Sequence, residues 1–300
     1  MSIEHTGAKA PEGIWDETPA DMEYLSHLLG ERAGILLESK RSLFVESRLL
    51  DLLYREKIGT VGQLVNRLRG APESYLHRLV VEALAIQETS FFRDQHPFVV
   101  LKTVLLPWLV KHRREEKHLS LWSAAASTGQ EAYSMAMVLD EVIPARGGWR
   151  VDLLGTDLSQ ENIKKARLGV YTQFEVNRGL PAALMLKYFT KTGEGWTVRE
   201  ELRRRVVFQE VNLIDPWPSL PLMDVVFLRN VLMYLDVRRR RQIVARVRQV
   251  MRPDGFLVLG AGESLPPEEG FHLYRWKSMD IYQPQEAQEY PSELSKVESK

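Results

Sequence analysis

Cysteine is absent from the sequence. Its absence excludes disulfide bridges, thiolate nucleophiles and zinc sites built on cysteine, and it is compatible with the cytoplasmic location that we expect. An excess of charge is missing as well, because 40 Lys and Arg residues are balanced by 40 Asp and Glu residues. General nucleic-acid-binding proteins usually carry a basic excess. The charge balance therefore argues against a nucleic-acid partner.

Long apolar runs are scarce too. The most apolar stretch, residues 98–110, is too short to span a membrane and contains Lys102 and Pro107. Residues 1–20 include acidic residues and prolines but no apolar core, which is unlike a signal peptide. We therefore expect no direct insertion into a membrane. A chain of 300 residues can hold one large or two modest domains.

The residue pattern divides the chain into four parts. Residues 1–18 are polar and punctuated by glycine and proline, which predicts a flexible amino terminus. Residues 19–88 have apolar positions at helical spacing, with Thr60 as one N-cap, and predict a small all-helical domain. In residues 89–283 short apolar runs alternate with helical stretches, the pattern of an α/β domain with a parallel sheet. Residues 284–300 are polar and predict a disordered tail.

Strands of the α/β domain are expected where short apolar runs end at Gly, Pro or Asp. The predicted buried strands are Leu119–Ala125, Val151–Gly155, Val206–Phe208, Asp224–Leu228 and Phe256–Gly260. Residues 271–282 suit an antiparallel hairpin at the sheet edge. A smaller hairpin is expected at Thr190–Val198, inside an insertion at about 185–205, because glycines flank residue 194.

Two features at the ends of predicted strands indicate a cofactor site. Ser127-Thr128-Gly129 joins a predicted strand to a predicted helix, as in the nucleotide-binding turn of doubly wound proteins, although an ordinary βα turn has the same pattern. Asp157 ends the next strand, where a carboxylate can accept both hydroxyls of a ribose or cap the following helix. Together they favour an adenosine-containing cofactor. The further glycines of a diphosphate-binding turn are missing, so a cofactor without phosphate fits better.

Asparagine follows two other predicted strands. Asn212 comes after the run that ends at Phe208, and Asn230 comes after the run that ends at Leu228. Ligands of open α/β sheets lie outside the carboxyl ends of strands. Both side chains are therefore candidates to hydrogen-bond an adenine edge or a methionine head group, although each of them alone is also typical of a turn.

Six blocks of sequence carry a family resemblance. They span about residues 20–283 and include Glu88–Asp94, Trp122–Gly129, Gly155–Asp157, Ala166–Tyr171, Asn212–Pro218 and Phe227–Asp236. Through these blocks the chain resembles the CheR-type chemoreceptor glutamate methyltransferases. The resemblance implies a Rossmann-like, seven-stranded methyltransferase sheet over residues 89–283, a small amino-terminal helical domain and a small β-hairpin subdomain.

The resemblance also implies an activity. The chain would transfer a methyl group from S-adenosylmethionine to glutamate carboxylates in the cytoplasmic helical bundle of a chemoreceptor. The products would be glutamate methyl esters, which serve sensory adaptation, and S-adenosylhomocysteine. It would act as a monomer, and no metal is implied.

Single residues receive roles from the resemblance. Arg93 and Tyr234 would be catalytic, and Tyr234 would face the substrate carboxylate. Asp157 would take the ribose hydroxyls, and Glu131 would bind the methionine amino group. The full set of cofactor-binding residues would be Gln87, Thr89, Arg93, Ala125, Glu131, Asp157, Asn212, Leu213, Arg229 and Asn230. Gln87 departs from the family pattern, which often has asparagine there.

Docking residues are expected in the helical domain. The resemblance implies that Lys40, Arg41, Arg48 and Arg55 grip the acidic receptor helices, although a solvated amphipathic face has the same composition. The short hairpin at Thr190–Val198 offers little exposed strand for a bound peptide. We therefore expect no dependence on a peptide at the receptor's carboxyl terminus.

The chemistry of methyl transfer to glutamate suits these residue types. A glutamate carboxylate is ionised at neutral pH, so no general base is required. The sulfonium donor is positive and the acceptor is negative, so charge cancels as the methyl group moves, and in-line alignment can supply much of the rate. Arg93 can hold a carboxylate through two parallel hydrogen bonds, and Tyr234 can donate one more.

Three alternatives stay open at the level of the sequence. One is a catalytically weak domain that binds the cofactor and signals, which the presence of both Arg93 and Tyr234 disfavours. Another is a methyltransferase of the same fold that acts on a different substrate. The last is a nicotinamide dehydrogenase, which the missing glycines disfavour.

Overall fold

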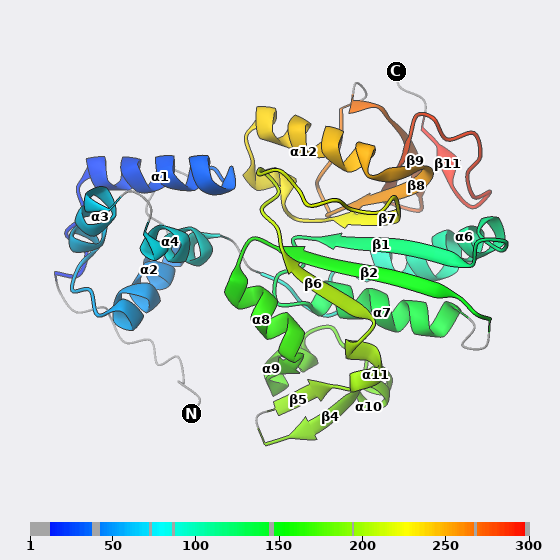
Figure 1. Ribbon diagram of the computed structural model, residues 1–300, viewed down its shortest axis with the longest axis horizontal. Helices are drawn as coiled ribbons and strands as arrows, with labels where there is room; N and C mark the ends of the chain where they lie inside the picture. Colours follow the sequence, from blue (N-terminus) through cyan, green and yellow to red (C-terminus); the bar gives the residue numbers. More distant parts are fainter. Residues whose placement is uncertain are drawn as a thin grey trace. The chain divides into compact units, whose positions relative to one another are not determined.

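The computed structural model consists of two compact units, Met1–Ile86 and Gln87–Lys300 (Figure 1). The residues that the structure describes are 13–37, 43–71, 74–85, 88–143, 147–193, 195–266 and 269–297. Within these ranges, no helix is both long enough and apolar enough to cross a membrane.

The first unit is helical, as its apolar periodicity predicts. Thr18 caps the first helix and forms a reciprocal capping box with Asp21. Thr60 caps the third helix, as expected, and its side chain accepts a hydrogen bond from the backbone N–H of Gln63. The helices of this unit are α1 (Pro19–Ala33), α2 (Leu43–Glu56), α3 (Val61–Gly70) and α4 (Tyr75–Leu84).

A large sheet organises the second unit. Its strands are β1 (His118–Ala124), β2 (Arg150–Asp157), β6 (Val206–Glu210), β7 (Met223–Leu228), β8 (Met251–Leu259), β9 (Phe271–Trp276), β10 (Met279–Pro284) and β11 (Ser295–Lys296). The strand order is β11-β9-β10-β8-β7-β1-β2-β6. Strands β6, β2, β1, β7 and β8 run parallel, and β9, β10 and β11 add antiparallel pairs. This arrangement confirms the Rossmann-like α/β fold.

In the described part of the chain the sheet has eight strands, so the prediction of seven was wrong. The additional strand is β11, and it lies in the segment from residue 284 for which we expected disorder. There the backbone N–H of Val297 donates to the carbonyl of Leu273 (2.9 Å), and Leu294 is buried. The prediction weighed side-chain polarity, but strand addition is made by main-chain groups that any side chain can accompany.

Helices connect the strands of the second unit and cover its sheet. They are α5 (His96–Val100), the π-helix η1 (Leu101–Leu105), α6 (Leu106–His112), α7 (Gln130–Val142), α8 (Gln160–Leu168), α9 (Gln173–Asn177), α10 (Ala182–Tyr188), α11 (Glu200–Arg203), the 3₁₀-helix η2 (Leu232–Tyr234) and α12 (Val237–Gln249). Alternate strand residues such as Leu121 and Phe227 pack in one core cluster with α5, α6 and α7. The residues between them, such as Trp122 and Val226, are also buried, and so are Ile243, Val244 and Val247 of α12.

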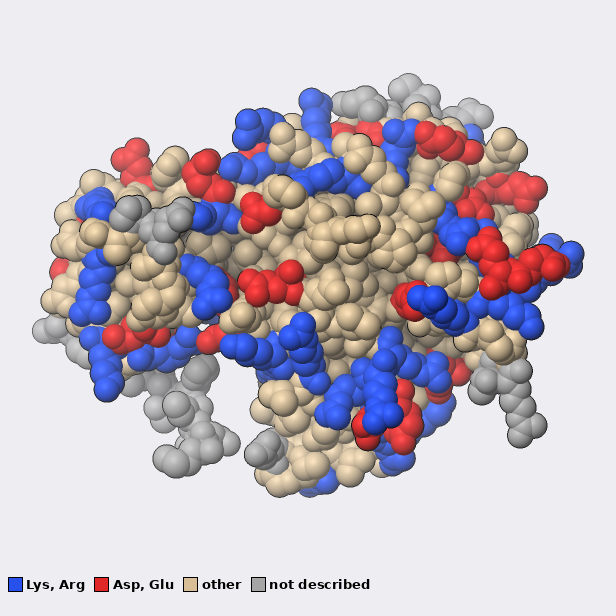
Figure 2. Space-filling view, viewed as in Figure 1, with Lys and Arg blue, Asp and Glu red and all other residues tan. Residues whose placement is uncertain are grey.

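A small antiparallel sheet contains the expected hairpin. Its order is β3-β5-β4, from β3 (Val170–Tyr171), β4 (Phe189–Thr192) and β5 (Gly195–Val198). Tyr171 is buried and packs edge-on against Phe91, with ring centroids 5.0 Å apart. Its hydroxyl donates to the carbonyl of Thr128 (2.7 Å). The small sheet is thus fastened to the turn that follows β1. The surface of the molecule mixes both charges, as Figure 2 shows for one face.

Candidate functional site

The candidate site lies at the carboxyl ends of the parallel strands. Strand β1 pairs with β2 on one side and with β7 on the other, so the crossover connections leave it in opposite directions. This is the switch point at which doubly wound sheets bind ligands. Three non-glycine residues there adopt a left-handed backbone conformation, namely Ala125 (φ 60°), Ser127 (φ 51°) and Asn230 (φ 58°). Such conformations cost free energy and concentrate at functional sites.

The turn after β1 depends on its single glycine. Gly129 has φ 97° and stands at the N-cap of α7. A Cβ at this position would lie 2.9 Å from Cβ of Ala166 and 3.1 Å from the hydroxyl of Tyr171. Another residue would therefore be strained and would also displace α8 or the small sheet.

Asp157 is held by the loops on both sides of it. One carboxylate oxygen accepts from the backbone N–H of Ser127 (2.8 Å), and the other accepts from Ser159 N (2.9 Å) and Asn162 Nδ2 (3.0 Å). Ser159, rather than Asp157, is the N-cap of α8. The carboxylate is buried and oriented at the end of β2, where a ribose would lie in this fold.

Arg229 joins three segments of the site. Its Nη1 donates to Glu131 Oε2 (2.8 Å), and its Nη2 donates to Asp94 Oδ2 (2.7 Å) and to the carbonyl of Arg93 (2.9 Å). The other oxygen of Glu131 accepts from Ser123 Oγ (2.7 Å). The side chain of Arg229 is 1% exposed, and its Nε is buried without a hydrogen-bond partner among the described residues. A buried donor without a partner is costly.

The side chain of Arg93 lies against the segment that precedes it. Its Nη1 donates to the carbonyl of Glu88 (2.6 Å), and the residue is half-buried, as is Thr89. The hydrogen bond and charge of Arg178, with a further contribution from Arg93, hold the pKa of the Glu88 carboxyl below its ordinary value. Gln87 lies outside the described residues.

The loop after β6 brings the two predicted adenine neighbours beside Asp157. The backbone N–H of Val211 donates to the carbonyl of Asp157 (2.9 Å). Asn212 itself forms a turn, because its side chain accepts from Ile214 N (3.3 Å) and donates to Asp215 Oδ2 (2.9 Å). Leu213 is buried. The hydrogen bonds of Asn212 are thus those of a turn residue, and Leu213 is a buried apolar neighbour of Asn212.

Glu263 was missed by the sequence analysis. Its carboxylate accepts hydrogen bonds from four backbone N–H groups: Asn230 (2.7 Å), Val231 (2.9 Å), Met233 (3.2 Å) and Gly260 (2.8 Å). It therefore shapes the loop that carries Asn230 and leads to Tyr234. The available signal was an acid just beyond the end of a predicted strand, the same signal that identified Asp157.

Tyr234 ends η2 and is half-buried. Its backbone N–H donates to the carbonyl of Val231 (3.1 Å). The hydroxyl makes no hydrogen bond with any residue in the part of the chain that the structure describes. The group is thus available to a substrate, as the predicted role requires.

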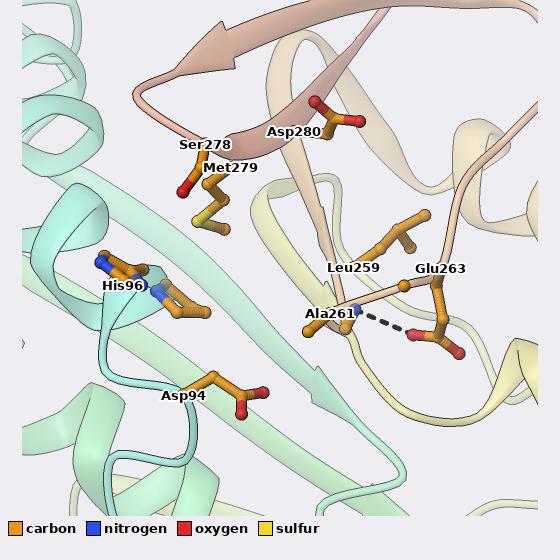
Figure 3. A pocket seen from close by; sticks show the side chains of 11 residues that line it. Asp94, His96, Leu259, Ala261, Glu263, Ser278, Met279 and Asp280 are labelled. Atoms are coloured by element: carbon orange, nitrogen blue, oxygen red, sulfur yellow. Dashed lines mark hydrogen bonds between the residues drawn. The ribbon is translucent and has the colours of Figure 1, made fainter.

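A pocket of about 210 Å³ opens beside this site, at the carboxyl end of β8 (Figure 3). Eleven residues line it, including the carboxylates of Asp94, Glu263 and Asp280, and none of the eleven is lysine or arginine. An acceptor carboxylate would meet charge of its own sign there. The pocket is therefore poorly suited to bind an anionic group.

The sheet order, the strained turn after β1 and the acid at the end of β2 define the class of Rossmann-like, S-adenosylmethionine-dependent methyltransferases. The family described as "CheR methyltransferase, SAM binding domain" matches residues 87–278. The chain belongs to this CheR methyltransferase family, which binds S-adenosylmethionine.

Curated relatives agree over most of the chain. Chemotaxis protein methyltransferase 1 of Pseudomonas aeruginosa is 38% identical over 250 residues, which cover 82% of this chain and 90% of the relative. Chemotaxis protein methyltransferase Cher2 of Pseudomonas putida is 36% identical over 249 residues, with the same coverage. The chemotaxis protein methyltransferase of Escherichia coli is 34% identical, covering 82% of this chain and 84% of the relative. The relatives place this chain among methyltransferases of chemotaxis.

Proposed function

We propose that this chain methylates glutamate carboxylates in the cytoplasmic helices of a chemoreceptor. The products would be glutamate methyl esters and S-adenosylhomocysteine, formed in the cytoplasm for sensory adaptation. The observation that carries the proposal is the identity of 38% over 82% of the chain with a chemotaxis protein methyltransferase. Retention of Arg93 and Tyr234 beside the cofactor region supports an active enzyme rather than a binding domain.

The described residues fit S-adenosylmethionine from end to end. Asp157 would accept the ribose hydroxyls, and the loop with Asn212 and Leu213 would flank the adenine. Glu131 would attract the amino group at the methionine end, while the positive charge of Arg229 behind it would favour the methionine carboxylate. Ala125, with its left-handed backbone, and Asn230 would line the space between them, and Thr89 with Gln87 would border the reaction centre. When bound, the cofactor supplies a methyl group on a positively charged sulfur.

The protein's task in the reaction is alignment. A glutamate carboxylate is already ionised near neutral pH, so the site needs no base. Arg93 would hold one or both oxygens of the acceptor, exchanging its contact with the carbonyl of Glu88 for a stronger charged one. Tyr234 would donate from its hydroxyl, which has no partner among the described residues, and would fix the acceptor in line with the methyl group.

Receptor docking through the helical unit remains part of the proposal. Lys40 and Arg41 lie outside the described residues. Arg48 and Arg55 lie on α2, where Arg48 is half-buried and Arg55 is exposed, and both also interact within the chain. A basic contribution from these residues would weaken with salt, since charges near the surface are screened.

Transfer of labelled methyl groups tests the proposed function. Purified protein is incubated with S-adenosylmethionine labelled in the methyl group and with membranes that contain or lack a chemoreceptor from the same source. We expect label in the receptor band that mild alkali releases as methanol, because carboxyl methyl esters hydrolyse and methylamines do not. Label that resists alkali, or equal label without receptor, would contradict the proposal.

A further inference from the structure

Helix α12 carries charge that its own stability does not explain. Six of its thirteen residues are arginine, none is acidic, and four of the arginines, residues 238–241, fall in its first turn or just after it. Cations near a helix amino terminus oppose the helix dipole. Figure 2 shows basic side chains gathered over this helix. The arginines in the first turn of α12 must therefore serve contacts other than stabilisation of the helix itself.

Most of these arginines are used inside the molecule. Arg239 pairs with the capping residue Asp236 (2.7 Å), and Arg240 Nε donates to the carbonyl of Leu232 (3.2 Å). Arg241 lies 3.4 Å from Glu269, Arg246 donates to the carbonyl of Leu213 (2.6 Å), and Arg248 pairs with Glu286. Arg238 differs from them. It is exposed, and its side chain makes no recorded interaction with the residues that the structure describes.

Arg238 stands next to the proposed reaction centre. Tyr234 precedes it by four residues, and the contacts of Arg239 and Arg240 fasten the start of α12 to the loop that holds Tyr234. Two large apolar side chains on the same stretch face solvent, Met233 with 53% and Val237 with 62% of their surface exposed. An exposed apolar pair, next to a cation with no partner among the described residues and close to the proposed catalytic tyrosine, has the composition of a contact surface.

We propose that Met233, Val237 and Arg238, the α12 surface, dock the receptor helix that carries the acceptor glutamate. The inference rests on the proposed function and names a second binding element for its substrate. The occupant is an amphipathic helix with a second acidic residue near the methylated one. Its apolar face covers Met233 and Val237, and its second carboxylate pairs with Arg238 while the acceptor glutamate reaches Tyr234. Opposite charge selects this partner, since a basic or neutral helix gains nothing from Arg238.

Charge reversal at Arg238 tests the α12 surface. The variant Arg238→Glu places an acid in the first turn of α12, which the helix dipole favours, so the fold should be retained or slightly stabilised. We expect KM for the receptor to rise about tenfold, with kcat and the affinity for S-adenosylhomocysteine unchanged. Arg238→Lys, which keeps the charge, should restore most of the loss. The salt dependence of kcat/KM should be weaker in Arg238→Glu than in the wild type.

The matched control is Arg114→Glu. Arg114 has a side chain that is 78% exposed, and it precedes the amino end of β1, whereas the site lies at the carboxyl ends of the strands. This variant makes the same change in net charge and should keep KM within about twofold of the wild type. If Arg238→Glu and Arg114→Glu have the same KM for the receptor while the wild type methylates it, the proposal that the α12 surface docks the receptor is wrong. If the wild type itself transfers no methyl group to receptor, the proposed function is wrong.

Discussion

Arg229, at the end of β7, donates a hydrogen bond to the carboxylate of Glu131, in the first turn of α7, over 2.8 Å. The same guanidinium contacts Asp94, so one buried cation connects three segments that are far apart in the sequence. Two fixed carboxylates compensate its charge, and its Nε is buried without a hydrogen-bond partner among the described residues. Arg229 therefore fixes how β7, α7 and the segment around Asp94 meet.

Arg229→Lys should damage the site although it keeps the positive charge. A lysine cannot reproduce the planar fork that reaches Glu131 and Asp94 together. We expect a loss of about 1–3 kcal/mol in the free energy of unfolding and a weakening of S-adenosylhomocysteine binding by at least about tenfold. Denaturant titration and calorimetry measure both. The control is Arg178→Lys at the exposed pair with Glu88, which should change either quantity little; equal effects would contradict the role of Arg229.

Asp157→Asn should weaken cofactor binding by about 1.5 kcal/mol, or about tenfold, because a charged acceptor for the ribose hydroxyls is lost. Asp157 also fixes Ser127 and Ser159, so the substitution could act through the loops alone. Calorimetry with S-adenosylhomocysteine and with its 2′-deoxy analogue separates the two causes. A direct contact predicts that the variant discriminates less between the two ligands than the wild type does; unchanged discrimination would remove the 2′-hydroxyl from the role of Asp157.

The sequence predicted the positions of those candidate residues that follow a buried strand. Asp157 and Asn230 follow runs whose apolar residues identify them as strands, so their place at one sheet edge follows from topology. The partners of Arg229 could not be found in this way. Glu131 and Asp94 lie 98 and 135 residues from it, and such pairs appear only when the chain is folded. The prediction for the tail failed for a related reason, because β11 is held by main-chain pairing.

A second buried cation should control stability rather than function. Arg113 Nε donates to Asp224 Oδ1 (2.9 Å), and its Nη1 donates to Asp254 Oδ2 (2.8 Å). The side chain of Asp224 is 1% exposed, and Arg252 approaches it only to 3.5 Å. Removing one partner of a buried pair leaves an uncompensated charge. Arg113→Ala should therefore lower the free energy of unfolding by about 3–5 kcal/mol at neutral pH. Arg114→Ala, at an exposed side chain, should leave it almost unchanged.

The loss in the free energy of unfolding caused by Arg113→Ala should depend on pH. Burial raises the pKa of Asp224 above its ordinary value of 3.8 even with Arg113 present, and loss of the cation should raise it further. Burial also raises the pKa of Asp254, but Arg113 outweighs this and holds that pKa below 3.8. A carboxyl group whose pKa is higher in the folded than in the unfolded protein lowers the free energy of unfolding as pH rises. A carboxyl group whose pKa is lower in the folded protein contributes to the free energy of unfolding, and this contribution is lost in acid. The difference between variant and wild type should thus shrink as both carboxylates become protonated below about pH 4; a pH-independent difference would contradict this origin.

Removal of the receptor's carboxyl-terminal tail should leave methylation unchanged within about twofold. In the small sheet, β5 is paired on both sides, and the edge strands β3 and β4 have only two and four residues. A bound peptide needs an exposed edge with side-chain pockets. Initial rates with intact and truncated receptor check this prediction. A large loss of methylation rate on truncation, or tight binding of the isolated tail peptide, would contradict this prediction and show that the edge of β4 is long enough to bind a peptide.

The most direct test of the central claim is mass spectrometry of a chemoreceptor after incubation with this protein and S-adenosylmethionine. We predict one added methyl group on glutamate side chains of the cytoplasmic helices, removed by mild alkali. The addition should be lost with Arg93→Ala and slowed with Tyr234→Phe, both of which should still bind S-adenosylhomocysteine. Methyl groups on lysine or arginine, or full activity of Arg93→Ala, would contradict the assignment of a glutamate methyltransferase with Arg93 at its reaction centre.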